Sequence, residues 1–272
     1  MERFVFPGGY NDQPAGSGNM MRVAVVQLAI QRGRRTATLQ AALHSIDTLA
    51  EVNPAPDLVI LPAFSDVLEL ASGEVGMSAR LAGPTVEACG LRARQWGIFV
   101  ALGFAEAGPD KPYLTGVLLD RDGDVRLTHR QEYSCPGDLF GKGGAPDATN
   151  LILGRVALLA GGDCASRDAW SELSELDASL VIGPACSGYA DGTTAPAREE
   201  FHRAVSEGAK RAGAWAAVAD VTTGNDKSGR ICPGYSVIVG PDGEVVAAAE
   251  PFRPATLWAD MQLPAVEAIQ ST

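Results

Sequence analysis

Short, nearly continuous apolar runs recur along the chain with helical stretches between them, and this alternation constrains the fold more than any other feature. The run RVAVVQLAI, residues 22–30, is rich in valine and lacks the polar–apolar alternation of a strand with one solvated face. Comparable runs follow at residues 57–62, 98–106, 154–161, 178–185, 215–221 and 256–261. Strands of this kind are buried on both faces, so the sequence predicts an α/β protein whose sheets are covered by helices.

The segments between these runs predict four helices and two hairpins. Leu39, Leu43, Ile46 and Ala50 are spaced along one face of a helix, and the predicted helices cover residues 36–50, 84–96, 167–176 and 197–212. Residues 113–131 and 235–250 are predicted hairpins, because each contains an Asp-Gly pair between two apolar segments. The core is continuous, so we expect one large domain.

Composition and charge exclude several classes of protein. No run of about 18 apolar residues is present, so we expect a protein without a membrane span. The chain has 33 acidic and 22 basic residues, a net charge of −11, which argues against binding to a nucleic-acid backbone. Five widely spaced cysteines, an odd number, favour a reducing cytoplasm over a disulfide framework.

The sequence contains none of the short motifs that indicate a metal or a cofactor. It has no C-x-x-C pair, and its three histidines are far apart. It has no P-loop and no glycine-rich dinucleotide fingerprint after a strand. We therefore expect neither a bound metal nor a nucleotide cofactor.

The ends of the chain are expected to lie outside the folded domain. Residues 1–20 are rich in Gly, Pro, Asn and Asp and lack the basic start and apolar centre of a secretory signal. We predict a flexible N-terminal extension over residues 1–20, a domain over residues 21–262 and a C-terminal tail over residues 263–272.

Four segments, in order, resemble the carbon–nitrogen hydrolase (nitrilase) superfamily. RVAVVQL with the following helix and DLVILP resembles its first two strands, and GFAEAGPDKPYLTGVLLDRDGDVRLTHRQ resembles its central hairpin. GRVALLAGGD with the next helix and DASLVIGPA resembles the strand, turn and strand that carry the nucleophile. RAGAWAAVADVTTG with GYSVIVGPDGEVVAAA resembles the late strands.

The resemblance implies a four-layer α-β-β-α sandwich that assembles into homodimers or larger homo-oligomers through helix faces. It also implies hydrolysis or condensation of amides, nitriles or carbamoyl groups by a Cys-Glu-Lys triad. In that chemistry a thiolate attacks carbon, a carboxylate transfers protons, and an ammonium stabilises developing negative charge.

All three triad positions are changed in this chain. The family glutamate follows a Leu-Pro pair, where this sequence has Ala63. The family lysine follows the arginine of the central hairpin, where this sequence has Gln131. The family cysteine lies two residues before the aspartate of the turn; that aspartate is Asp163, and the nucleophile position is Gly161. A methyl, a carboxamide and a hydrogen therefore replace the reacting groups.

Neighbouring residues offer only weak replacements for the triad. Cys164, expected in the first turn of a helix, is the nearest thiol, but Asp163 beside it disfavours a thiolate. Cys186 follows a strand that lines the family pocket, so we assign Asp163, Cys164 and Cys186 to the binding pocket. Arg130 should point away from Gln131, because neighbouring residues of a strand face opposite sides.

The remaining charged residues and cysteine near these segments carry less weight. Glu132 should lie on the same face of the strand as Arg130. Asp66 and Glu69 follow the end of the second strand, and the pattern does not fix the direction of their side chains. Cys135 lies in a Pro-Gly loop and has no assigned role.

Three functions follow from this interpretation. The first is a pseudoenzyme that binds a small amide- or nitrile-like ligand or a protein partner. The second is an active amidase or nitrilase with a rebuilt site that uses Cys164 or Cys186. The third is a structural subunit that forms a heteromer with an active paralogue. The loss of all three triad groups favours the first.

Overall fold

The protein is described here from a computed structural model that covers residues 19–30, 34–63, 81–133, 140–186, 194–222 and 232–264. Residues 1–18 of the predicted extension (1–20) and residues 265–272 of the predicted tail (263–272) lie outside the described residues. Asn19 and Met20 already belong to the first strand, and Leu263 belongs to the last one.

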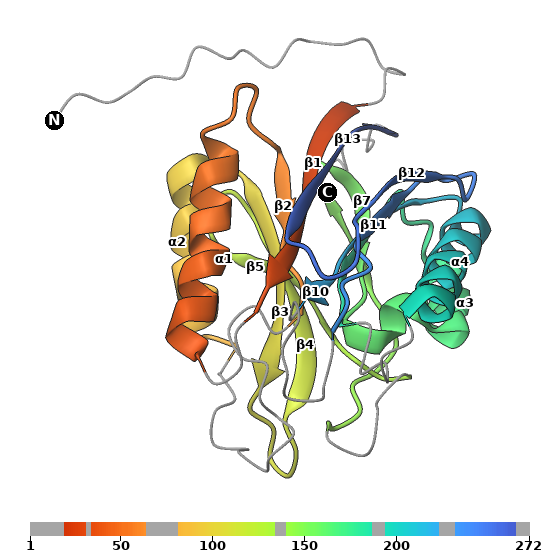
Figure 1. Cartoon of the computed structure of the whole chain (residues 1–272), viewed down its shortest axis with the longest axis horizontal. Coiled ribbons are helices and arrows are strands. Elements are labelled where there is room, and N and C mark those ends of the chain that lie inside the picture. The colour runs from red at the N-terminus through yellow and green to blue at the C-terminus, as the bar shows by residue number, and fades with distance from the viewer. Residues whose placement is uncertain are drawn as a thin grey trace, which may run out of the picture.

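Two sheets form the centre of the molecule (Figure 1). The order in sheet one is β10-β1-β2-β3-β4-β5, with β13 also paired to β1. Its strands are β1 (Asn19–Ala29), β2 (Leu58–Ile60), β3 (Phe99–Glu106), β4 (Tyr113–Leu119), β5 (Val125–Arg130), β10 (Val221–Thr222) and β13 (Ala255–Leu263). The order in sheet two is β12-β11-β9-β8-β7-β6. Its strands are β6 (Ala148–Leu151), β7 (Gly154–Leu158), β8 (Leu180–Pro184), β9 (Trp215–Ala219), β11 (Val237–Val239) and β12 (Val245–Ala248).

One pair of helices covers the outer face of each sheet (Figure 1). Helices α1 (Arg35–Ala50) and α2 (Pro84–Trp96) pack on sheet one, and α3 (Arg167–Leu173) and α4 (Thr194–Ala212) pack on sheet two. The predicted α-β-β-α sandwich is confirmed. No helix in the described part of the chain combines the length and apolar character needed to cross a membrane.

Alternation along the strands sends side chains into two different cores. In β1, Val23 and Val25 pack between the sheets, whereas Ala24 and Val26 pack beneath α1 and α2. In β8, Leu180 and Ile182 pack between the sheets, whereas Val181 faces α3 and α4. Each of these central strands is therefore apolar on both faces, which explains its continuous apolar sequence.

The observed elements differ from the predicted ones mainly at the edges of the sheets. Strand β1 begins at Asn19, three residues earlier than expected, because its first half pairs with β13 from Asn19↔Leu263 to Gln27↔Ala255. Strand β6 was not predicted, because its sequence ATNL is polar and lies at the edge of sheet two. The predicted helix 167–176 is divided into α3 and a 3-10 turn, Ser174–Leu176.

A buried amide joins the two sheets. Gln27 of β1 is 1% exposed, and its Oε1 accepts a hydrogen bond of 3.0 Å from Ser236 N, just before β11. Its Nε2 donates to Glu250 O at 2.8 Å and Arg253 O at 2.9 Å, in the connection between β12 and β13. The hydrogen bonds compensate the cost of burying these polar groups between the sheets.

We expect Gln27→Leu to lower the free energy of unfolding by about 2–4 kcal/mol, because it leaves a buried N–H and two carbonyls without this partner. Gln40→Leu, at an exposed position of α1, should change it by about 0.5 kcal/mol or less. Urea denaturation of both variants measures the difference, and equal effects would mean that the Gln27 network contributes nothing.

Candidate functional site

Gly161 lies at the sharp turn between β7 and α3. The chain leaves β7 at Leu158 and forms a 3-10 turn over Gly161–Ala165 before α3 begins. Gly161 is buried and has φ +57°, in the left-handed region that strains other residues. The predicted strand, turn and helix are confirmed, and the sharp strand-to-helix turn has the shape of a nucleophile elbow.

The Gln131 side chain occupies the space beside Gly161. Gln131 is 1% exposed, and its Oε1 accepts a hydrogen bond of 3.0 Å from Gly162 N. A Cβ built at Gly161 would overlap Gln131 Oε1 and Leu114 Cδ2. A side chain at position 161 would therefore need Gln131 and Leu114 to move.

Ala63 lies close to the same place, between the sheets. It is fully buried just after β2, and its N donates to Ala185 O at 3.0 Å. A Cβ built at Gly103 of β3 would lie 2.6 Å from Ala63 Cα, which shows how closely the two segments approach. The apolar cluster around Ala63, here called the Ala63 cluster, consists of Ile30, Ala63, Ala105, Leu114, Phe140, Cys186, Val221 and Cys232.

Leu114 connects the three positions that the resemblance assigns to the triad. It belongs to the Ala63 cluster, its O accepts a 2.9 Å hydrogen bond from Gln131 N, and its Cδ2 lies against Gly161. The structure thus brings Gln131 and Gly161 together at Leu114, which belongs to the same cluster as Ala63, although the three positions are far apart in sequence.

Asp163 holds the turn against the end of β5. Its carboxylate is fully buried; Oδ2 accepts from Glu132 N at 2.7 Å and lies 2.9 Å from His129 Nε2, while Oδ1 accepts from Tyr133 N at 2.8 Å. We assigned Asp163 to the binding pocket, yet these contacts with the protein itself occupy both oxygens. They fix the position of Gln131 between His129 and Glu132.

Cys164 lies on the other side of sheet two from this site. Its side chain belongs to the core beneath α3 and α4, and its Sγ is 2.9 Å from a Cβ built at Gly183 on the helix face of β8. The thiol is fully buried, and burial, followed by the charges of Asp163 and Asp220, raises its pKa well above the ordinary value. Cys164 is in the 3-10 turn rather than in the first turn of α3.

Cys186, unlike Cys164, lies in the Ala63 cluster beside the candidate site. It is 8% exposed, directly follows Ala185, whose carbonyl binds Ala63 N, and packs in the Ala63 cluster. Cys232, which the sequence analysis did not single out, belongs to the same cluster. None of the four cysteines in the described part of the chain forms a disulfide.

Arg130 points away from Gln131, as the strand alternation predicted. Its Nε and Nη2 each donate to a different oxygen of Glu106 at 2.8 Å, and its guanidinium lies 4.6 Å from the centre of the Tyr113 ring. Thr115 Oγ1 also donates to Glu106, at 2.7 Å. Burial alone would raise the pKa of Glu106, but the hydrogen bonds from Arg130 and Thr115 and the Arg130 charge outweigh it and lower the pKa.

Of the other sequence candidates, the structure describes Glu132. Glu132 is half-buried and lies 3.6 Å from Lys142 Nζ. Asp66, Glu69 and Cys135 lie outside the described residues. Within the described ranges, no group of three His, Cys, Asp or Glu side chains is placed to hold a metal ion.

Comparison with known families places this geometry in context. The family model described as carbon-nitrogen hydrolase matches residues 22–271. The chain belongs to the carbon-nitrogen hydrolase family. Among curated proteins, none matches the sequence at a significant level.

Solved structures similar to this family member include amidases. A mutant of the amidase from Nesterenkonia sp. AN1, with acrylamide added at the active-site cysteine, has a TM-score of 0.76 at 20% identity, covering 89% of this chain and 93% of that one. A mutant of the same amidase in complex with butyramide has a TM-score of 0.76 at 21% identity, covering 90% and 92%. At these identities the similarity establishes the fold.

The sequence analysis missed two residues of this family member that help to form the site. His129 has the same alternation as Gln131, so the period of the strand could have placed it on the inner face. Leu114 carries no local signal, because its role depends on how β4 meets the turn from the other sheet.

We expect Gly161→Ala to lower the free energy of unfolding by about 2–4 kcal/mol, because it adds backbone strain and overlap with Gln131 and Leu114. Gly97→Ala is a matched control: Gly97 has φ +66° but a Cβ there meets nothing within 4 Å, so we expect about 1 kcal/mol. In a Gln131→Ala background the cost at position 161 should fall. Equal costs for Gly161→Ala and Gly97→Ala in urea denaturation would contradict this account.

The lowered pKa of Glu106 predicts a pH-dependent contribution to stability. The contribution is complete above the ordinary value of 4.5 and is lost as the pH falls through the lower pKa of the folded state. Glu106→Gln should therefore cost about 1–3 kcal/mol at pH 7 and progressively less below pH 4.5. Urea denaturation across this range measures it; Glu175→Gln, at an exposed position, should show no such dependence.

Proposed function

We propose that this chain is a non-catalytic member of the carbon-nitrogen hydrolase family that binds a small, uncharged, amide-like ligand. The observation that carries the proposal is the Gln131 carboxamide lying against Gly161 and beside Leu114, a member of the cluster that contains Ala63. These are the positions to which the resemblance assigns the ammonium, the thiol and the carboxylate. They hold no charge and no nucleophile, although their surrounding framework is that of the amidases.

The chemistry of the family cannot proceed through these three side chains. Covalent hydrolysis needs a nucleophile that forms an acyl intermediate, a group that moves protons, and a donor for the developing charge. Glycine, alanine and a neutral carboxamide supply at most a hydrogen-bond donor. Cys164 does not replace the nucleophile, because its thiol is buried on the far side of sheet two with a raised pKa.

The choice of ligand follows from the same residues. The side chains at these three positions carry no charge, which favours an uncharged ligand, because a buried ion without an opposite charge is strongly disfavoured. Related structures include an amidase in complex with butyramide, which is a small amide of this kind.

A cytoplasmic location remains a prediction from the cysteine content.

The alternative function is a hydrolase with a rebuilt site that uses Cys186. This candidate is favoured over Cys164 by one observation, its position in the Ala63 cluster. It needs a carboxylate or cation close to the thiol.

Turnover assays on a panel of short amides and nitriles should detect no ammonia release above the buffer rate. In the same samples, butyramide should raise the melting temperature without being consumed. Ala63→Val, which adds two methyl groups at this site, should abolish the shift. Ala178→Val, an equally buried site on the helix side of sheet two, should keep it.

A covalent probe separates the two functions. Fluoroacetamide added covalently to the active-site cysteine in a mutant of the Nesterenkonia amidase. For this chain, mass spectrometry of the intact protein should show no rapid single adduct. Ammonia release that disappears in Cys186→Ala, together with an adduct on Cys186, would refute the non-catalytic function.

A further inference from the structure

The outer face of sheet one reaches the surface where β1 begins. Ala24 and Val26 of β1 pack beneath α1 and α2. Side chains alternate along a strand, so Met20 and Arg22 lie on the same face as these two. Met20 is 64% exposed. On this face, the described helices therefore cover the second half of β1 and leave its first half at the surface.

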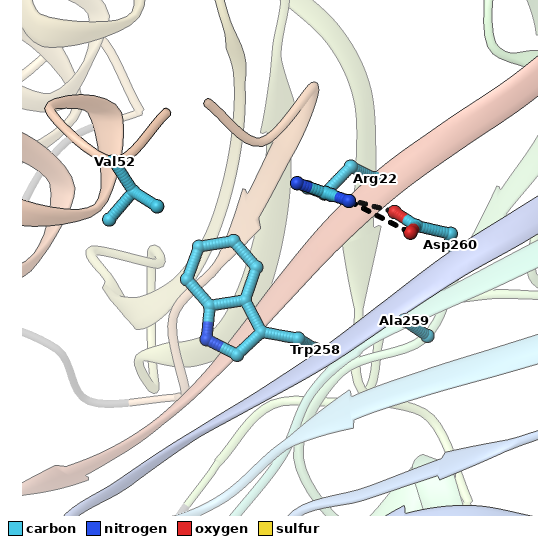
Figure 2. Close-up of a pocket in the computed structure, with 5 residues that line it drawn as sticks. All are labelled: Arg22, Val52, Trp258, Ala259 and Asp260. Atoms are coloured by element: carbon cyan, nitrogen blue, oxygen red, sulfur yellow. Dashed lines mark hydrogen bonds and ion pairs between the residues drawn. The ribbon is translucent and has the colours of Figure 1, made fainter. Parts of the chain in front are cut away.

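A hollow with apolar and charged parts lies on this face. It has a volume of about 290 Å³ and is lined by Arg22, Val52, Trp258, Ala259 and Asp260 (Figure 2). The Trp258 ring extends from β13 across β1 toward Val52, and this tryptophan is 37% exposed. Arg22 and Asp260 form a two-fold hydrogen-bonded ion pair, with Nε–Oδ1 at 2.7 Å and Nη2–Oδ2 at 2.9 Å. Because these two charges bind each other, the indole and Val52 make the hollow suited to an apolar occupant.

The segment that precedes β1 is joined to the chain beside this hollow. Asn19 is the first residue of β1 and comes three residues before Arg22, and residues 1–18 lie outside the described residues. The longest apolar run in these 18 residues is Phe4-Val5-Phe6, which carries two aromatic rings. Aromatic rings pair favourably with an indole and with a guanidinium, and the hollow offers both groups.

The length of this segment fits the distance to be spanned. Trp258 pairs with Ala24, five residues along β1 from Asn19, which corresponds to about 17 Å. Asn19 follows Phe6 by 13 residues, and a glycine-rich chain of that length has a root-mean-square span of about 20 Å. The two distances match, which gives the aromatic run an effective concentration of about millimolar size at the hollow.

We propose that residues 4–6 dock in this hollow of their own chain and complete the outer layer of sheet one beside α1. One of the two phenylalanine rings packs on the Trp258 indole and covers Val52, so apolar surface on three segments is removed from water together. This docking surface lies outside the candidate ligand site and does not depend on the proposed ligand.

Two other occupants fit the hollow less well. The C-terminal residues 265–272 start close to the same place, because Leu263 pairs with Asn19, but they contain no aromatic residue. A second copy of the chain carries the same net charge of −11 and is repelled, whereas a segment of the same chain is held near the hollow by its own backbone.

A photo-reactive side chain tests where the segment lies. The full chain with p-benzoylphenylalanine at position 4 should cross-link to its own peptides that contain Val52 or Trp258, as mapped by mass spectrometry. A mixture of ¹⁵N-labelled and unlabelled chains distinguishes links within one chain from links between two. In a Trp258→Ser background the link to Val52 should fall roughly fivefold, because the ring that holds the probe is gone. Leu91→Ser, at an exposed apolar residue of α2, is the control and should leave the yield unchanged.

Three outcomes of the cross-linking would overturn the proposal. They are a link to residues 265–272 or to the candidate ligand site instead of the hollow, a link mainly between two chains, and a link to the hollow that Trp258→Ser and Leu91→Ser affect equally. Absence of any link to the hollow would overturn it as well.

A double-mutant cycle tests the contact without the probe. The combined change Phe4→Ser and Phe6→Ser should lower the urea midpoint of unfolding, and this loss should shrink by about half or more in a Trp258→Ser background, because the two partners share one contact. The Leu91→Ser background should keep the full loss. An equal loss in all three backgrounds, or no loss at all, would contradict docking at Trp258. Neither experiment uses the proposed ligand, so its failure leaves the proposed function untouched.

Discussion

The buried carboxylate of Asp163 is the interaction on which the arrangement of the site depends. It joins the turn after β7, in sheet two, to the end of β5, in sheet one, through two backbone N–H groups and His129. A buried carboxylate is stable only when its oxygens are well bonded, so the two segments are held firmly together. We call this set of bonds to Asp163 the clamp. Gln131 lies between His129 and Glu132, which both bond to Asp163, so the clamp holds its amide against Gly161 and Gly162.

The clamp explains how a catalytic framework can persist without its reacting groups. Asp163 and the left-handed backbone of Gly161 keep the shape of the turn, and neither depends on a side chain at position 161. Glycine even removes the strain that any other residue would experience there. Gln131 then fills the space next to the turn and satisfies Gly162 N. The residues at positions 131 and 161 thus fit this turn closely: glycine takes its backbone conformation without strain, and the glutamine bonds the following N–H.

The sequence predicted the layers of the fold well, because buried parallel strands have a direct signature. Val23 to Val26 are apolar on both faces of β1, and no solvated surface could accommodate them. The polar edge strand β6 and the early start of β1 gave no such signature, since both are set by pairing with a partner strand elsewhere in the chain. Positions 63, 131 and 161 were found through family resemblance. The contact of Gln131 and Gly161 with Leu114, a member of the Ala63 cluster, depends on tertiary packing that no local pattern encodes.

The position of Cys164 shows that closeness along the chain does not place a side chain in the same site. Only two residues lie between it and Gly161, yet the 3-10 turn places its thiol beneath α3 and α4, on the face of sheet two opposite to the Ala63 cluster. Cys186 is 25 residues from Gly161 by numbering and nevertheless shares that cluster. In a two-sheet sandwich, the face of the sheet on which a side chain packs decides which site it can belong to. A thiol within one turn of the nucleophile position can therefore be unable to replace it.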